Sequence, residues 1–208
     1  MTGHVVLLGD SIFDNALYVP GGPSVLEHVR RLLPRDWRAT LLALDGAVVS
    51  SVFRQLERLP EDATHLVLSV GGNNALWTAG NYFSLETATV RDALEKIAEA
   101  QGEFASEYRK LIDELRAVGK PLAICTVYDA IPGLAASEIA GLCLFNDIIT
   151  RTAFQVGATL IDLRNLCREA SDYSGLSPIE PSAAGGGKIA RAILDAVLGG
   201  GASARVVA

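Results

Sequence analysis

Short, almost continuously apolar segments alternate along this chain with longer segments of helical periodicity, and this alternation limits the possible folds more than any other feature. Five apolar segments have the length and composition of buried strands: residues 4–9, 39–44, 65–70, 121–127 and 158–163. Strands that are apolar on both faces are typical of parallel sheets covered by helices on both sides. We therefore predict an α/β fold, a three-layer sandwich whose five-stranded parallel sheet has a flavodoxin-like, doubly wound order.

The segments between the predicted strands carry the signals of amphipathic helices. One helix is expected to begin at Ser24, because Glu27 follows three residues later and completes a capping box. A clear apolar periodicity occupies the second half of the connection from about residue 85 to 118, and a final helix is expected over about residues 182–198.

Length and composition fit one domain. A chain of 208 residues suits a single large core, and we expect this domain to span residues 1–198. The glycine run and the small residues that follow favour a flexible C-terminal tail over residues 199–208. Half of the residues are hydrophobic and only 20% are charged, which excludes an intrinsically disordered chain.

Charge and targeting features bear on partners and location. The chain has 24 acidic and 18 basic residues, and its acidic surface repels phosphate groups, so no nucleic-acid partner is expected. No apolar stretch reaches the roughly 20 residues of a membrane span, and no secretory signal is recognisable, so a cytoplasmic location is expected.

The cysteines Cys125, Cys143 and Cys167 lack metal-site spacing and are expected to be buried, reduced thiols. No dinucleotide-binding or P-loop motif occurs, so no cofactor is expected. The oligomeric state cannot be inferred from the sequence.

Three loops that follow predicted strands carry residues suited to a hydrolytic site. Gly9-Asp10-Ser11 follows the first strand, Gly46 lies after the second, and Gly71-Gly72-Asn73-Asn74 follows the third. The carboxyl ends of parallel strands meet at one edge of a sheet, so a nucleophile at Ser11 and donors at Gly46 and Asn73 could converge there. Each motif alone is equally compatible with an ordinary turn, because glycine and asparagine tolerate positive φ.

Together these motifs resemble those of the SGNH hydrolases, also called the GDSL family of esterases and lipases. The resemblance covers residues 4 to about 198, with Asn74 in place of the usual aspartate of the third motif. It implies that Ser11 attacks an ester carbonyl. It also implies that the backbone amides of Ser11 and Gly46 and the side-chain amide of Asn73 form the oxyanion hole. The implied partner is a small-molecule ester.

The stretch that resembles the fourth family motif lacks the expected histidine. This motif reads Asp-x-x-His before the final helix, and here Ser177 falls at the aspartate position and Glu180 at the histidine position. The three histidines of the chain are unsuitable replacements for it. His4 and His65 begin strands, at the end of the sheet far from Ser11, and His28 lies along a predicted helix.

Two interpretations of Glu180 remain open. In the first, Glu180 is the general base for Ser11, with burial raising its pKa toward a useful value, and the protein is a serine hydrolase of short acyl or acetyl esters. In the second, Glu180 caps the last helix or pairs with a basic neighbour. The protein would then be a catalytically degenerate binding module for small molecules.

Further residues near this edge of the sheet are expected to surround the substrate. Asp10, Asn74 and Tyr128 are predicted to bind it, because each lies just after a predicted strand. Trp77 is a candidate wall for an acyl group or a sugar. Asp172 precedes the fourth motif and either orients Glu180 or starts a turn.

Overall fold

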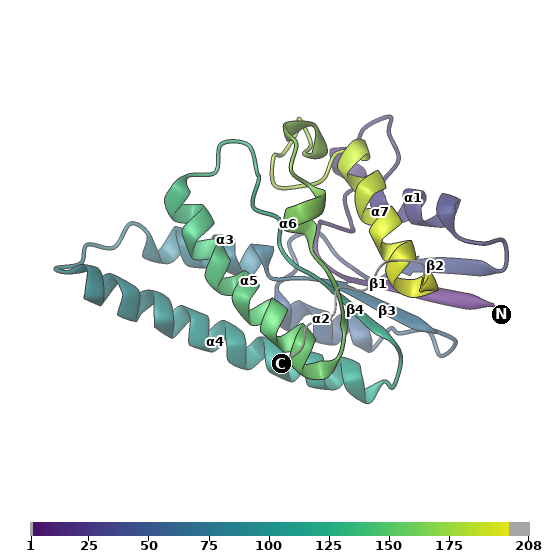
Figure 1. The fold of residues 1–208 in the computed structure, drawn as a ribbon, viewed down its shortest axis with the longest axis horizontal. Coiled ribbons are helices and arrows are strands. Elements are labelled where there is room, and N and C mark those ends of the chain that lie inside the picture. The colour runs from purple at the N-terminus through teal and green to yellow at the C-terminus, as the bar shows by residue number, and fades with distance from the viewer. Residues whose placement is uncertain (1, 200–208) are drawn as a thin grey trace.

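The computed structural model describes residues 2–199 as a parallel sheet covered by helices on both faces (Figure 1). The strands are β1 (Gly3–Gly9), β2 (Trp37–Leu41), β3 (His65–Ser69), β4 (Leu122–Cys125) and β5 (Thr159–Ile161). They lie in the order β2-β1-β3-β4-β5, and every neighbouring pair is parallel. The predicted three-layer α/β fold with doubly wound order is confirmed. Of the tail expected over residues 199–208, only the first residue lies within the described part of the chain.

Alternate side chains of each strand face different helical layers, which explains the nearly continuous apolar runs. Val5 and Leu7 pack beneath α1 (Val25–Leu32) and α7 (Ala183–Leu198) on one face. On the other face, Val6 and Leu8 pack with α2 (Val49–Leu56), α4 (Val90–Ala117) and α5 (Ala136–Val156). A strand buried on both faces has no polar side to alternate with, so its sequence is apolar throughout.

The packing of α7 against α1 fixes where the last loop before α7 lies. The side chain of Ser24 accepts a hydrogen bond from the Glu27 backbone, and the Glu27 carboxylate accepts one from the Ser24 backbone, so the predicted capping box of α1 is confirmed. Glycines at the start of α7 allow close contact: a side chain at Gly185 would collide with the carbonyl oxygen of Asp172. The loop that carries Glu180 is therefore attached to a closely packed helix pair.

Several local features differ from the expectations. Helix α3 (Gly72–Tyr82) was not predicted, because its Gly-Gly-Asn-Asn start has the composition of a turn. Strand β2 begins and ends earlier than expected, since the amides of Leu42 and Ala43 both donate to the carbonyl of Leu7 and end the regular ladder. Short helical turns α6 (Leu163–Leu166), η1 (Ala16–Tyr18) and η2 (Ala170–Asp172) lie in loops. Cys125 and Cys167 are buried free thiols as expected, whereas Cys143 is exposed on α5.

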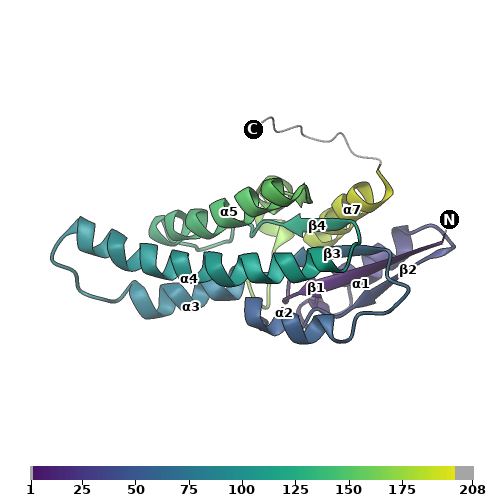
Figure 2. The same cartoon turned by 90° about the horizontal axis from the view of Figure 1, so that it is seen from below.

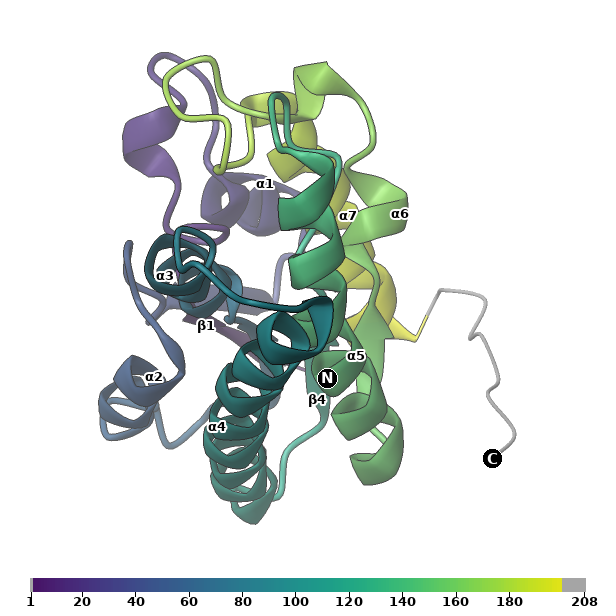
Figure 3. The same cartoon turned by 90° about the vertical axis from the view of Figure 1, so that its left-hand side faces the viewer.

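Three helices project beyond the sheet. The end of α3, the start of α4 and the start of α5 lie together past the strands, as Figure 1 shows at the left and Figure 3 shows end-on. Figure 2 shows the same segments side by side from below, and contacts join all three pairs of these helices. We call this part of the molecule the helical extension. Among residues 2–199, no helix combines the length and apolar character that crossing a membrane requires.

Candidate active site

Ser11 lies in a tight turn that follows β1. Gly9 ends the strand with φ of 125°, a conformation that glycine adopts readily, and a side chain there would collide with the carbonyl of Ser69 on β3. The amides of Phe13 and Asp14 then donate to the carbonyl of Asp10, each at 3.1 Å, and close the turn. Ser11 is held at the carboxyl edge of the sheet as predicted.

Donors suited to a negatively charged oxygen come from the loops after the first three strands of the chain. Within residues 2–199, no hydrogen bond uses the backbone N–H of Ser11 or of Gly46, and Gly46 has φ of 74° on an exposed turn. Asn73 uses one N–H of its side-chain amide on the carbonyl of Ala47, at 2.9 Å, and this leaves its second N–H for a ligand. The three predicted oxyanion-hole residues thus each retain a donor.

The loops that carry Gly46 and Asn73 are tied together. The side-chain oxygen of Asn74 accepts a hydrogen bond from the backbone of Val49, at the start of α2, with a distance of 3.1 Å. This bond and the Asn73 contact with Ala47 bridge the start of α3 to the second loop. Asn74 therefore braces the site, and its expected contact with substrate stays a prediction.

Glu180 is 3% exposed and lies beside Ser11. Burial raises the pKa of its carboxyl, and the charge of Asp45 raises it further, while the hydroxyls of Ser177 and Ser11 oppose these effects. Its Oε2 atom is buried and has no hydrogen-bond partner in the described part of the chain. The Ser11 hydroxyl is thus close enough to act on the carboxyl, although the two do not form a regular hydrogen bond between residues 2 and 199.

Glu180 does not cap the last helix, and it does not pair with a basic neighbour in the described part of the chain. The N-terminus of α7 is capped by Ser182, whose hydroxyl accepts from the amides of Ala184 and Gly185. No basic side chain among residues 2–199 forms an ion pair with Glu180. Its backbone is fixed instead, since its carbonyl accepts from the amide of Ser174 at 2.9 Å. A buried carboxyl that forms no ion pair in the described part of the chain and has one oxygen free of hydrogen bonds can accept a proton from a neighbouring hydroxyl.

Asp172 does not orient Glu180. Its Oδ2 accepts from Lys188 Nζ at 2.7 Å and from the backbone of Glu169 at 3.0 Å, and the residue ends the short turn η2. Of the two roles considered for Asp172, the structure supports the turn.

A second buried carboxyl, that of Asp10, adjoins Ser11. Burial raises the pKa of Asp10 to about 7, and the charges of Glu180 and Asp45 add to this effect, although hydrogen bonds from backbone amides such as that of Ile12 oppose it. The Ile12 amide donates to Asp10 Oδ1 at 3.1 Å. The site therefore contains two neighbouring carboxyls, and the negative charge of Glu180 is one of the causes that raise the pKa of Asp10.

The three histidines are engaged elsewhere. His4 lies at the start of β1, with its ring nitrogens 3.0 Å from Asp62 Oδ1 and 2.8 Å from Thr40 Oγ1. His65 lies at the start of β3, and the Nε2 atom of His28 contacts the carbonyl of Ala183 at 2.8 Å. Both strand-starting histidines are at the edge of the sheet opposite Ser11, as expected.

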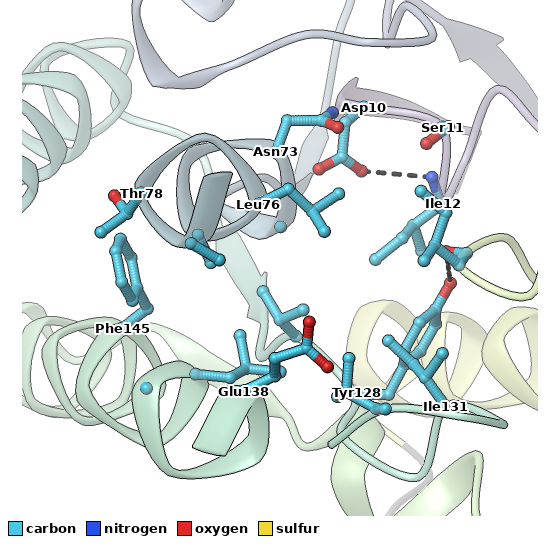
Figure 4. A pocket seen from close by; sticks show the side chains of 18 of the residues that line it. Asp10, Ser11, Ile12, Asn73, Leu76, Thr78, Tyr128, Ile131, Glu138 and Phe145 are labelled. Atoms are coloured by element: carbon cyan, nitrogen blue, oxygen red, sulfur yellow. Dashed lines mark hydrogen bonds between the residues drawn. The ribbon is translucent and has the colours of Figure 1, made fainter. Parts of the chain in front are cut away.

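An apolar trough opens beside Ser11 and continues between α3 and α5. Figure 4 shows Asp10, Ser11 and Asn73 on one side of this space and Glu138 across it. Its empty volume is about 810 Å³, part of which opens to solvent. The other lining residues are mainly apolar and come from the loop after β1, helices α3, α4 and α5, the loop after β4 and the loop before α7: Ile12, Gly72, Ala75, Leu76, Thr78, Ala79, Phe83, Ile97, Val127, Tyr128, Ile131, Leu134, Gly141, Leu142, Phe145 and Ile179.

Tyr128 and Asp10 line the trough, as their positions after strands predicted, but Trp77 does not. Because residues 72–82 are helical, Trp77 turns away from the trough and is 60% exposed, while Leu76 and Ala79 face it. The sequence analysis did not identify these α3 residues. The apolar residues Ala75, Ala79 and Phe83 recur every four residues, and this spacing is the signal that could have revealed them.

Comparison with known proteins identifies the family and the fold of this chain. The model of the GDSL-like lipase/acylhydrolase family matches residues 7–186. Comparison with curated proteins gives no match. Among solved structures, the fold is similar to that of the acetyl xylan esterase AlAXEase, at 18% identity and a TM-score of 0.69 over 93% of this chain and 99% of that one.

Two lipase structures have the same fold. An extracellular lipase from Streptomyces rimosus is 17% identical with a TM-score of 0.68 over 94% of this chain and 100% of its own. The lipase Lip_vut3 from a goat rumen metagenome is 15% identical with a TM-score of 0.72 over 94% of this chain and 97% of its own. These similarities show the fold, and the family match extends over most of the chain. The protein therefore belongs to the GDSL-like lipase/acylhydrolase family, a family of carboxylic ester hydrolases.

Proposed function

We propose that this protein hydrolyses small-molecule carboxylic esters with Ser11 as the nucleophile and Glu180 as the general base. The observation that carries this proposal is the buried carboxyl of Glu180 beside the Ser11 hydroxyl, with its Oε2 atom free of a hydrogen-bond partner in the described part of the chain. The family membership supports the reaction class, and the two residues are assigned here from the geometry.

The reaction proceeds through an acyl-enzyme. Ser11 Oγ attacks the ester carbonyl while its proton passes to the Glu180 carboxylate, and the carbonyl oxygen becomes an oxyanion. The N–H groups of Ser11, Gly46 and Asn73 stabilise this oxyanion, each contributing about 3 kcal/mol. Glu180 then returns the proton to the departing alcohol. Water attacks the acyl-enzyme in the second half and gives its proton to Glu180. Glu180 then returns this proton to Ser11 Oγ as the bond between Ser11 and the acyl group breaks, which releases the acid and regenerates the free enzyme.

A raised pKa improves Glu180 as a base. A carboxylate with an ordinary pKa is a poor acceptor for a hydroxyl proton, and efficiency increases as the pKa of the base approaches the working pH. Burial raises the pKa of Glu180 in this direction. The hydroxyl of Ser177 interacts with the Glu180 carboxyl and stabilises its charged form, which opposes the rise in its pKa. Ser177 occupies the position where the family motif has an aspartate.

The sequence motifs favour short acyl or acetyl esters, and the structurally similar proteins include both acetyl xylan esterases and lipases. Short esters of activated alcohols are therefore suitable first substrates. Initial rates with p-nitrophenyl acetate and butyrate should be lost in Ser11→Ala and strongly reduced in Glu180→Gln. Loss in Ser11→Ala with full activity in Glu180→Gln would refute the assignment of the base.

A catalytically degenerate binding module is the second candidate. It is favoured by the absence of a regular hydrogen bond between Ser11 and Glu180 in the described part of the chain. The double variant Ser177→Asp with Glu180→His restores the family motif. Strong activity in this variant alone would favour the degenerate module, whereas ordinary turnover by the unmodified protein would exclude it.

A further inference from the structure

We propose that the acyl group of the substrate is an unbranched hydrocarbon chain of medium length, such as octanoyl, which lies in the trough between α3 and α5. Phe83, resting against Gly141, forms the far end of this acyl site. The inference rests on the proposed function, because it places the ester carbonyl at Ser11, and it identifies the substrate class of that same site.

The trough begins at the nucleophile and follows one face of α3. Asn73 contributes to it beside Ser11, and Leu76, Ala79 and Phe83 continue it along the helix. From Gly72 to Phe83 the helical rise corresponds to about 16 Å. An acetyl group at Ser11 would fill only the first part of this length and leave the remaining apolar surface in contact with water.

The polar side chains along the trough are already hydrogen-bonded to the backbone. Thr78 donates to the carbonyl of Asn74 at 3.0 Å, and Tyr128 donates to the carbonyl of Ile179 at 2.6 Å. The Glu138 carboxylate accepts from the amide of Ala135 at 2.7 Å at the start of α5. Recognition of a sugar requires several polar groups directed at its hydroxyls, whereas the hydroxyls of Thr78 and Tyr128 hold the protein's own backbone and Glu138 has one carboxylate oxygen engaged in the same way. A hydrocarbon chain requires only the apolar surface.

Gly141 lets Phe83 close the trough. Glycine inside a helix costs about 1 kcal/mol relative to alanine, so its presence in α5 calls for a packing reason. A Cβ atom at Gly141 would lie 2.9 Å from Phe83 Cζ, which shows that the ring rests directly on the helix at this point. Phe83 follows the last residue of α3, and its own amide donates to Ala79 at 3.1 Å. The ring therefore spans from the end of α3 to α5.

The chain length of the acyl group should determine the rate. Each methylene that moves from water into the trough should increase kcat/KM about fourfold. A series of p-nitrophenyl esters from acetate to dodecanoate measures this dependence. We expect kcat/KM to rise from acetate to octanoate and then to level off where the chain passes Phe83.

Substitutions along the trough test its role. Ala79→Phe fills the middle of the trough and should lower the ratio of octanoate to acetate kcat/KM at least tenfold. Phe83→Ala opens the far end and should shift the preferred ester to longer chains. Ala140→Phe is the matched control, because Ala140 is exposed on α5 and does not line the trough. Highest kcat/KM with acetate, or an unchanged ratio in Ala79→Phe, would overturn the proposal.

A binding measurement separates this proposal from the proposed function. The ketones 2-decanone and 2-butanone resemble esters but cannot be hydrolysed, and calorimetry can measure their binding to the unmodified protein and to Ala79→Phe. Tighter binding of 2-decanone that Ala79→Phe abolishes supports the acyl site even if no ester is hydrolysed. Ester hydrolysis without any preference for the longer ketone would instead support the function and refute the acyl site.

Discussion

The hydroxyl of Tyr128 donates a hydrogen bond of 2.6 Å to the carbonyl oxygen of Ile179, the residue before Glu180. Tyr128 is buried after β4, and its ring meets that of Tyr173 edge-on with centroids 5.0 Å apart. Tyr173 also pairs with Pro181 in an antiparallel bridge, on the other side of Glu180. The two tyrosines therefore hold the backbone on both sides of the proposed base.

Tyr128→Phe keeps the ring and removes this hydrogen bond. We expect a loss of about 1 kcal/mol in the free energy of unfolding and a several-fold fall in kcat that is similar for short and long esters. Denaturant titration and a kcat comparison across two chain lengths measure both effects. A change in chain-length preference with normal kcat would instead mean that the hydroxyl acts on the acyl chain.

Glu180→Gln removes the proposed base with little change of shape. The expected fall in kcat/KM is on the order of 10²–10⁴-fold. In the unmodified protein Glu180 works as the carboxylate, so kcat/KM should rise with pH through its pKa, which burial places above the ordinary glutamate value. The pH profile should lose this acid limb in Glu180→Gln, and survival of the limb would assign it to another group.

Asp10 should limit activity on the alkaline side. Its pKa is raised to about 7, so a second negative charge develops beside Ser11 as the pH increases through this value. That charge opposes the forming oxyanion, and kcat/KM should decline above about pH 7. Asp10→Asn keeps an oxygen for the Ile12 amide and removes the charge, so its profile should stay level where that of the unmodified protein declines. The same decline in Asp10→Asn would contradict this assignment.

The same carboxyl should make stability depend on pH. The pKa of Asp10 rises from 3.8 in the unfolded chain to about 7 in the fold, so the folded state holds the proton more tightly. Its contribution to stability is complete below about pH 4 and is lost as the pH rises toward 7, by a few kcal/mol in total, to order of magnitude. Denaturant titrations from pH 4 to 8 should show Asp10→Asn gaining stability relative to the unmodified protein as the pH increases. A difference that is constant with pH would contradict this.

Gly185→Ala should disturb the loop that carries Glu180. The added methyl group would collide with the backbone carbonyl of Asp172, and backbone yields less readily than a side chain, so a loss of about 1–3 kcal/mol is expected. Gly102→Ala is the matched control, because Gly102 lies in α4 with open space around it, and it should gain up to about 1 kcal/mol. Thermal unfolding of both variants tests the difference, and equal behaviour would contradict the close packing.

Features set by local sequence were predictable, and those set by packing were not. The five strands and the Ser24–Glu27 capping box follow from short apolar runs and from spacing within one turn. Helix α3 was missed because its glycines and asparagines favour a turn locally, and contacts with α5 decide the outcome. The burial of Glu180 also depends on partners that are distant in sequence but adjacent in the fold, such as Tyr128, which no local pattern reveals.

The helical extension separates two tasks within one small fold. Ser11 and Gly46 lie in loops after strands and Asn73 lies in the first turn of α3, whereas Phe83 and Gly141 lie at the end of α3 and near the start of α5, past the sheet. Natural selection or protein engineering can therefore change the substrate specificity through substitutions in the helical extension alone. The reactive centre would be inherited intact, which makes this scaffold a suitable starting point for diversification.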